Sequence, residues 1–200
     1  MSQSEHKDYA GAKLGMWLFL FTELILFGGM FLLYAAYLDR YPQEFVAGGH
    51  QLDVVLGAVN TVVLLTSSLL AAMAVSAIQR NDRRLAMQLL VGTVLCAAIF
   101  IAIKYVEWST KIQHGIFPGS PKLAAGPPGE SVFFSLYYLT TGLHGLHVLI
   151  GGTLLTWVIL KVKRGTVHSG NYVLLENSAL YWHLVDLIWI FIFPLYYLIL

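Results

Sequence analysis

Five long apolar runs, separated by polar stretches, dominate the pattern along the chain. They cover residues 14–38, 54–78, 85–109, 132–160 and 179–200. Crossing about 30 Å of hydrocarbon takes roughly 20 helical residues, and lipid offers no partner to unpaired backbone groups. The pattern therefore predicts an all-α integral membrane protein, a single membrane domain over residues 1–200 with five transmembrane helices.

The connections between the runs are polar and contain helix breakers. Residues 39–42 end the first run at a proline, and residues 79–84 make a tight turn between the second and third. Residues 117–129 are rich in proline and glycine, which predicts an irregular surface loop. Residues 161–177 join the last two helices.

Basic residues are distributed unevenly between the two predicted ends of the helices. With five crossings, the N-terminus, the second connection and the fourth connection share one side. That side carries Lys7, Lys13, Arg80, Arg83, Arg84, Lys161, Lys163 and Arg164, against Arg40, Lys111 and Lys122 on the other. The positive-inside rule predicts a cytoplasmic N-terminus and a C-terminus on the outer side.

The composition agrees with a lipid environment. Hydrophobic residues make up 58% of the chain and charged residues 12%, against about 25% charged in an ordinary soluble domain. No basic face for nucleic acid is present. Cys96 is the single cysteine, so we expect neither an internal disulfide nor a thiolate metal cluster.

Glu23 is the first residue whose burial is costly, since it falls about ten residues into the first run, near the middle of the bilayer. A lone carboxylate in hydrocarbon is expensive unless it is protonated or paired. Two interpretations remain open. Glu23 is either a carboxyl that exchanges protons or a structural carboxyl that donates one interhelical hydrogen bond.

The fourth and fifth runs carry polar pairs at i, i+3 spacing. His144 and His147 share one helix face, and His183 and Asp186 share another. Three histidines and a carboxylate are compatible with a haem or a divalent metal. The alternative is an interhelical polar cluster, held by hydrogen bonds between these two helices, and the spacing alone favours this plainer interpretation.

The outer end of the third run holds Lys104, Glu107 and Trp108. The i, i+3 spacing predicts an ion pair within the helix, or a lysine that extends to the membrane interface. In the second run, residues 60–61 and 66–68 are Asn, Thr and Ser, for which we expect interhelical hydrogen bonds.

Five stretches together carry a family resemblance. They are GMWLFLFTE at 15–23, NT at 60–61 with SS at 67–68, EW at 107–108, TGLHGLHV at 141–148 and YWHLVDLIW at 181–189. In this order they resemble subunit III of the haem–copper respiratory oxidases, in its short five-helix bacterial form. The resemblance covers nearly the whole chain.

The resemblance implies a subunit of an oxidoreductase complex that is not itself catalytic. Such subunits pack on catalytic subunit I, with subunit II, in a proton-pumping oxidase of the aerobic respiratory chain. They carry no haem or copper, which belong to the partner subunits, and they bind phospholipid. The implied location is the bacterial inner membrane.

The resemblance also assigns roles to the polar and aromatic residues discussed above. Glu23 matches the carbodiimide-reactive buried carboxyl of the family. The three histidines and Asp186 match structural positions, so no metal site is implied. Lipid contact or packing is implied for Trp17, Glu107, Trp108 and Trp182.

Several alternatives stay open. The same motifs occur in a subunit associated with nitric oxide reductases, and a free-standing haem or metal protein would use His144, His147 and His183. Many family members have two further helices that this chain is expected to lack. Lys104 stands where the family commonly has a neutral residue. The electron donor, cytochrome c or quinol, and the haem type depend on other subunits.

Overall fold

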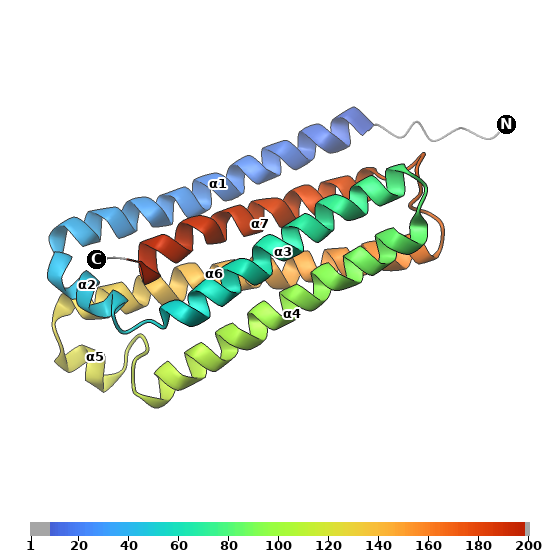
Figure 1. Ribbon diagram of the computed structural model, residues 1–200. Helices are drawn as coiled ribbons and strands as arrows, with labels where there is room; N and C mark the ends of the chain where they lie inside the picture. The colour runs from blue at the N-terminus through green and yellow to red at the C-terminus, as the bar shows by residue number, and fades with distance from the viewer. Residues whose placement is uncertain (1–8, 199–200) are drawn as a thin grey trace.

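The computed structural model describes residues 9–198. Its long helices are α1 (Tyr9–Arg40), α3 (Val54–Gln79), α4 (Arg83–Gln113), α6 (Pro128–Lys163) and α7 (Val173–Tyr197). They lie side by side in an elongated bundle (Figure 1). Each of these five helices is long and apolar enough to cross a membrane. The predicted all-α membrane fold is confirmed.

The long helices extend beyond the apolar runs, because backbone hydrogen bonding continues through polar residues. α4 reaches Gln113, so Glu107 lies inside the helix and not at its end. α7 begins at Val173, so Glu176 and Asn177, predicted to be part of a connection, lie in the helix. The predicted end of the last helix, at residue 200, lies outside the described residues.

Two connections contain short helices, α2 (Pro42–Gly49) and α5 (Pro121–Ala125), which lie at the same end of the bundle (Figure 1). The prediction of an irregular loop over residues 117–129 was therefore wrong for α5. Both helices begin with proline, whose missing N–H costs nothing in a first turn. The hydroxyl of Ser120 caps α5 by accepting from the backbone N–H of Leu123 at 3.2 Å.

The α3–α4 and α6–α7 connections lie together at the opposite end (Figure 1). Asn81 has φ 62°, a left-handed conformation that asparagine tolerates better than most residues. Asp82 caps α4 by accepting from the N–H of Leu85 at 3.0 Å. Arg83 donates to the backbone carbonyl of Lys163. Two basic connections thus meet at one end, and its cytoplasmic placement stays a prediction.

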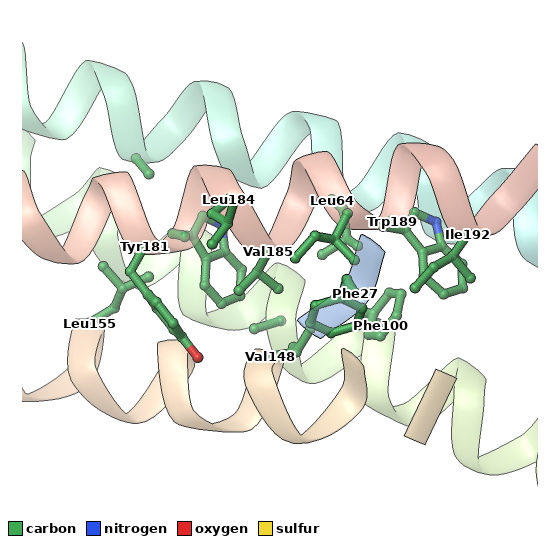
Figure 2. Packing of buried hydrophobic residues seen from close by; sticks show 14 of the residues in the cluster. Phe27, Leu64, Phe100, Val148, Leu155, Tyr181, Leu184, Val185, Trp189 and Ile192 are labelled. Carbon is green, nitrogen blue, oxygen red and sulfur yellow. The ribbon is translucent and has the colours of Figure 1, made fainter. Parts of the chain in front are cut away.

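Helix α7 is the most buried of the five long helices and packs against α1, α3 and α6. Figure 2 shows buried side chains of the four other long helices, Phe27, Leu64, Phe100 and Val148, gathered beside Val185 and Trp189 of α7. Helix α1 lies at the edge and exposes a row of large apolar side chains. Those side chains suit a helix whose outer face meets lipid.

The glycines of α6 differ in their surroundings. A Cβ at Gly151 would lie 2.7 Å from Cε3 of Trp182, so the large ring packs directly over this glycine. Gly145 would meet no atom within 4 Å, and Gly152 would meet only the Cβ of Ala97 at 3.8 Å. Of these three glycines, only Gly151 is therefore required for close packing.

Candidate functional site

Glu23 of α1 and His147 of α6 form a hydrogen-bonded pair at the edge of the bundle. The Glu23 Oε2 lies 2.9 Å from Nε2 of His147. The His147 Nδ1 lies 2.8 Å from the carbonyl oxygen of Leu143. A carbonyl only accepts, so Nδ1 carries a proton. Nε2 then either accepts from a protonated Glu23 or donates to its carboxylate, and the two states differ by the position of one proton.

The Glu23–His147 pair is largely buried, but both side chains keep some exposed surface. The two side chains are 13% and 9% exposed. The ring of Phe27 meets the imidazole edge-on, with ring centres 5.3 Å apart. The hydroxyl of Tyr181 donates to the backbone carbonyl of His147 at 3.3 Å. The sequence interpretation treated Glu23 and His147 separately, because nothing in the pattern shows that α1 packs on α6.

His144 lies one turn from His147 but in a different environment. Its ring is buried against Phe100 and Trp189, with ring centres 5.4 and 5.1 Å apart. Within residues 9–198, neither ring nitrogen of His144 has a hydrogen-bond partner. His144 therefore acts in the structure as an aromatic core residue.

His183 and Asp186 of α7 face α3. The Nδ1 of His183 lies 2.6 Å from the hydroxyl oxygen of Ser68. Asp186 lies within interaction range of Ser68, without a hydrogen bond of normal geometry. Among the described residues, no hydrogen bond joins His144, His147, His183 and Asp186 to one another. Instead, His147 bonds to Glu23 of α1, and His183 bonds to Ser68 of α3.

Hydroxyl groups of α3 bind the indoles of α7. The Trp182 Nε1 donates to the hydroxyl of Ser67, and the Trp189 Nε1 donates to that of Thr61, both at 3.0 Å. The predicted interhelical role is therefore confirmed for Thr61, Ser67 and Ser68. Trp182 is completely buried, whereas Trp17 of α1 is 60% exposed.

Lys104 of α4 lies in a polar cluster inside the bundle. Its Nζ donates to Glu107 Oε2 at 2.9 Å, to the Tyr137 hydroxyl at 3.0 Å and to the Tyr197 hydroxyl at 2.7 Å. The predicted ion pair is confirmed. Extension of the lysine to the membrane interface was wrong, because the side chain is only 8% exposed. Trp108 packs on Tyr138 with ring centres 5.1 Å apart.

The hydrogen bonds around Glu107 close this cluster. Its Oε1 accepts from the hydroxyls of Tyr137 and Tyr197, at 2.7 and 2.8 Å. The three ammonium protons of Lys104 and both phenolic protons thus have acceptors, which offsets the cost of burying two charges. Sequence reasoning missed both tyrosines. Tyr137 lies seven residues before His144, hence on the same face of α6, and that spacing was the available signal.

No group of three His, Cys, Asp or Glu side chains within residues 9–198 lies close enough together to hold a metal ion. Both ring nitrogens of His147 are hydrogen-bonded, and so is Nδ1 of His183. The residues that were considered as haem ligands therefore already have protein partners, with His144 as the exception.

Comparison with known proteins identifies the family. The sequence profile of the family described as "Cytochrome c oxidase subunit III" matches residues 3–199. This chain belongs to the cytochrome c oxidase subunit III family. The cytochrome c oxidase subunit 3 of Thermostichus vulcanus is 31% identical over 202 residues, covering 98% of this chain and 90% of that protein.

Relatives in the subunit III family carry more than one oxidase name. The probable quinol oxidase subunit 3 of Staphylococcus saprophyticus is 29% identical and covers 94% of this chain and 88% of that protein. The heme-copper oxidase subunit I+III of Aeropyrum pernix is 31% identical and covers 98% of this chain, which spans only 24% of that longer protein. The resemblance to subunit III of the haem–copper oxidases is confirmed.

Proposed function

We propose that this chain is the non-catalytic subunit III of a proton-pumping haem–copper terminal oxidase. In this role it packs on subunit I, with subunit II as a further partner, in the inner membrane of a bacterium. The observation that carries the proposal is the family match over nearly the whole chain. The Aeropyrum relative, which joins subunits I and III in its name, supports subunit I as the immediate partner.

The environment of the histidines supports a structural role for them. His147 uses both ring nitrogens in hydrogen bonds, and His144 is packed between two aromatic rings. Electron transfer to oxygen is accordingly assigned to haem and copper in the partner subunits. The contribution of this chain is to stabilise the complex during aerobic respiration and to hold phospholipid beside it.

Glu23 is the residue that we assign to proton chemistry. Its partner His147 allows one proton to move between carboxyl and imidazole without breaking either hydrogen bond. The partial exposure of the pair leaves a side from which a proton or a reagent can reach it. Lys104 and Glu107, by contrast, are fully paired, and we assign them to holding α4, α6 and α7 together.

The test is purification of the tagged chain in a mild detergent, followed by mass spectrometry and a visible spectrum. The expected result is recovery of oxidase subunits I and II, with haem absorbance in the complex and no Soret band in the isolated chain. Recovery of nitric oxide reductase subunits would overturn the assignment, and so would a bis-histidine Soret band in the isolated chain. Oxidation assays with cytochrome c and with quinol would identify the donor.

A further inference from the structure

Helix α7 leaves one stripe of its surface uncovered by the rest of the described chain. Leu187, Ile190 and Phe191 are exposed on it, although α7 is the most buried of the long helices. His183 lies one helical turn before Leu187, hence on the same side of the helix, and is partly buried. We call the surface formed by these four residues the α7 stripe.

His183 brings a polar nitrogen to the α7 stripe. Its Nδ1 lies 2.6 Å from the hydroxyl oxygen of Ser68 on α3. Within residues 9–198, Nε2 of His183 has no hydrogen-bond partner, and protein does not enclose this atom. The inner nitrogen of the ring is therefore satisfied by the chain itself, and the outer one is left for something outside it.

The depth of His183 decides what can reach its outer nitrogen. The residue lies about 15 Å from the start of α7 and about 21 Å from its end, at 1.5 Å per residue. That position is near the middle of the bilayer, away from water and lipid headgroups. Lipid tails accept and donate no hydrogen bonds, so a bare imidazole nitrogen there is costly. The group that satisfies Nε2 therefore belongs to another protein helix.

A hollow of about 190 Å³ lies between α1 and α7 beside the α7 stripe. Leu187 and Phe191 line it on α7, and Gly28 lines it on α1. A Cβ at Gly28 would meet no atom within 4 Å, so the missing side chain leaves this part of the surface open. Small residues of this kind allow the close approach of a second helix.

We propose that the α7 stripe is the docking site for a transmembrane helix of a partner subunit. That helix bonds to Nε2 of His183 through a hydroxyl, amide or carboxyl side chain, and it places an apolar side chain in the α1/α7 hollow. An acyl chain would fill the hollow but leave Nε2 unpaired. The identity of the partner as an oxidase subunit rests on the function proposed above, whereas the docking site itself does not.

One test separates the two nitrogens of His183. An asparagine amide reaches about as far as Nδ1, and a glutamine amide about as far as Nε2. His183→Asn is expected to raise the rate at which the partner dissociates about threefold, the usual effect of one interhelical hydrogen bond in a membrane. His183→Gln and Ser68→Ala are expected to stay near the wild-type rate, since both keep a polar group at the outer position. The rate is measured on the complex purified through the tagged chain in mild detergent.

A second test uses the photoreactive residue p-benzoylphenylalanine in place of Leu187. Irradiation of membranes is expected to crosslink this position to a transmembrane peptide of a partner subunit, which mass spectrometry identifies. The matched control is the same substitution at Leu95 of α4, which is also exposed but lies on a helix outside the α1–α7 contact. It is expected to give no crosslink to that peptide.

Three results would overturn the docking site. Equal dissociation rates for His183→Asn and His183→Gln would show that Nε2 makes no bond to a partner. Crosslinks from position 187 to lipid alone, or to a second copy of this chain, would assign the α7 stripe to those occupants. In each case the subunit III assignment would stand, because it is read from the subunits that co-purify. Crosslinks from position 187 to a nitric oxide reductase subunit would instead support the docking site and overturn the oxidase assignment.

Discussion

The Nζ of Lys104 lies 2.9 Å from Oε2 of Glu107, one turn away on α4, and protein encloses both side chains. Tyr137 from α6 and Tyr197 from α7 bind both members of the pair. The cluster thus links α4, α6 and α7 by hydrogen bonds to two buried charges that neutralise each other. Removal of one charge leaves the other buried without its counter-charge.

Lys104→Met is therefore expected to lower the free energy of unfolding by about 3–5 kcal/mol, the usual cost of breaking a buried ion pair. Glu107→Gln is expected to be similarly harmful. The double variant is expected to recover most of the loss, because it removes both charges together. Thermal unfolding in detergent measures the effect, with Lys163→Met as the exposed control. Additive losses in the double variant would contradict this account.

Dicyclohexylcarbodiimide is expected to label Glu23 and to spare Glu107. The reagent is apolar and reacts with protonated carboxyls. Glu23 is partly exposed at the edge of the bundle, whereas the Glu107 side chain is 2% exposed and paired with a cation. Peptide mass spectrometry after labelling in membranes measures the site. Labelling at Glu107, or unchanged labelling of the Glu23→Gln chain, would contradict the assignment of Glu23 as the reactive carboxyl.

Glu23→Gln is expected to leave assembly of the complex intact, since an amide can still bond to His147. Faster loss of oxidase activity over repeated turnovers is expected in the same variant, because the amide cannot hold the exchangeable proton. Subunit composition by gel electrophoresis and oxygen uptake over time measure the two effects. Activity that decays at the wild-type rate would leave Glu23 with a structural role alone.

The two adjacent glycines of α6 are expected to respond differently to alanine. Gly151→Ala forces a methyl group against Trp182, where Cβ would lie 2.7 Å from the ring, and overpacking of this kind costs about 1–3 kcal/mol. Gly152→Ala places the same methyl 3.8 Å from Ala97, an ordinary contact. Unfolding midpoints compare them. Equal stability of the two variants would contradict the packing described for α7.

The orientation in the membrane is testable with single cysteines in a Cys96→Ser background. Lys122→Cys lies in α5, and Ser169→Cys lies in the α6–α7 connection at the opposite end (Figure 1). An impermeant maleimide is expected to label the first in intact cells and the second only after lysis. The reverse pattern would show that the positive-inside count gave the wrong orientation.

Hydrophobic pattern alone was sufficient to predict the five long helices, because lipid permits few other structures for such runs. It did not predict α5 in the loop at 117–129, since a short helix there depends on local capping by Ser120 and carries no apolar repeat. Helix ends were misplaced for a related reason: polar residues such as Glu176 continue the helix beyond the hydrocarbon.

The site was predictable in its residues but not in its pairings. Glu23 and His147 stand 124 positions apart, and their contact follows from the packing of α1 on α6. Spacing within one helix showed the Lys104–Glu107 pair, whose partners are local. It could not show Tyr197, which comes from another helix. Short-range patterns thus predict intrahelical partners, while interhelical partners require the fold.

The most direct test of the account measures oxygen uptake by the complex that co-purifies with this chain, before and after the chain is stripped away. The account predicts that the remaining complex keeps its haem and its initial rate but inactivates in fewer turnovers. Haem absorbance that leaves with the chain would contradict it, as would a purified complex that reduces no oxygen.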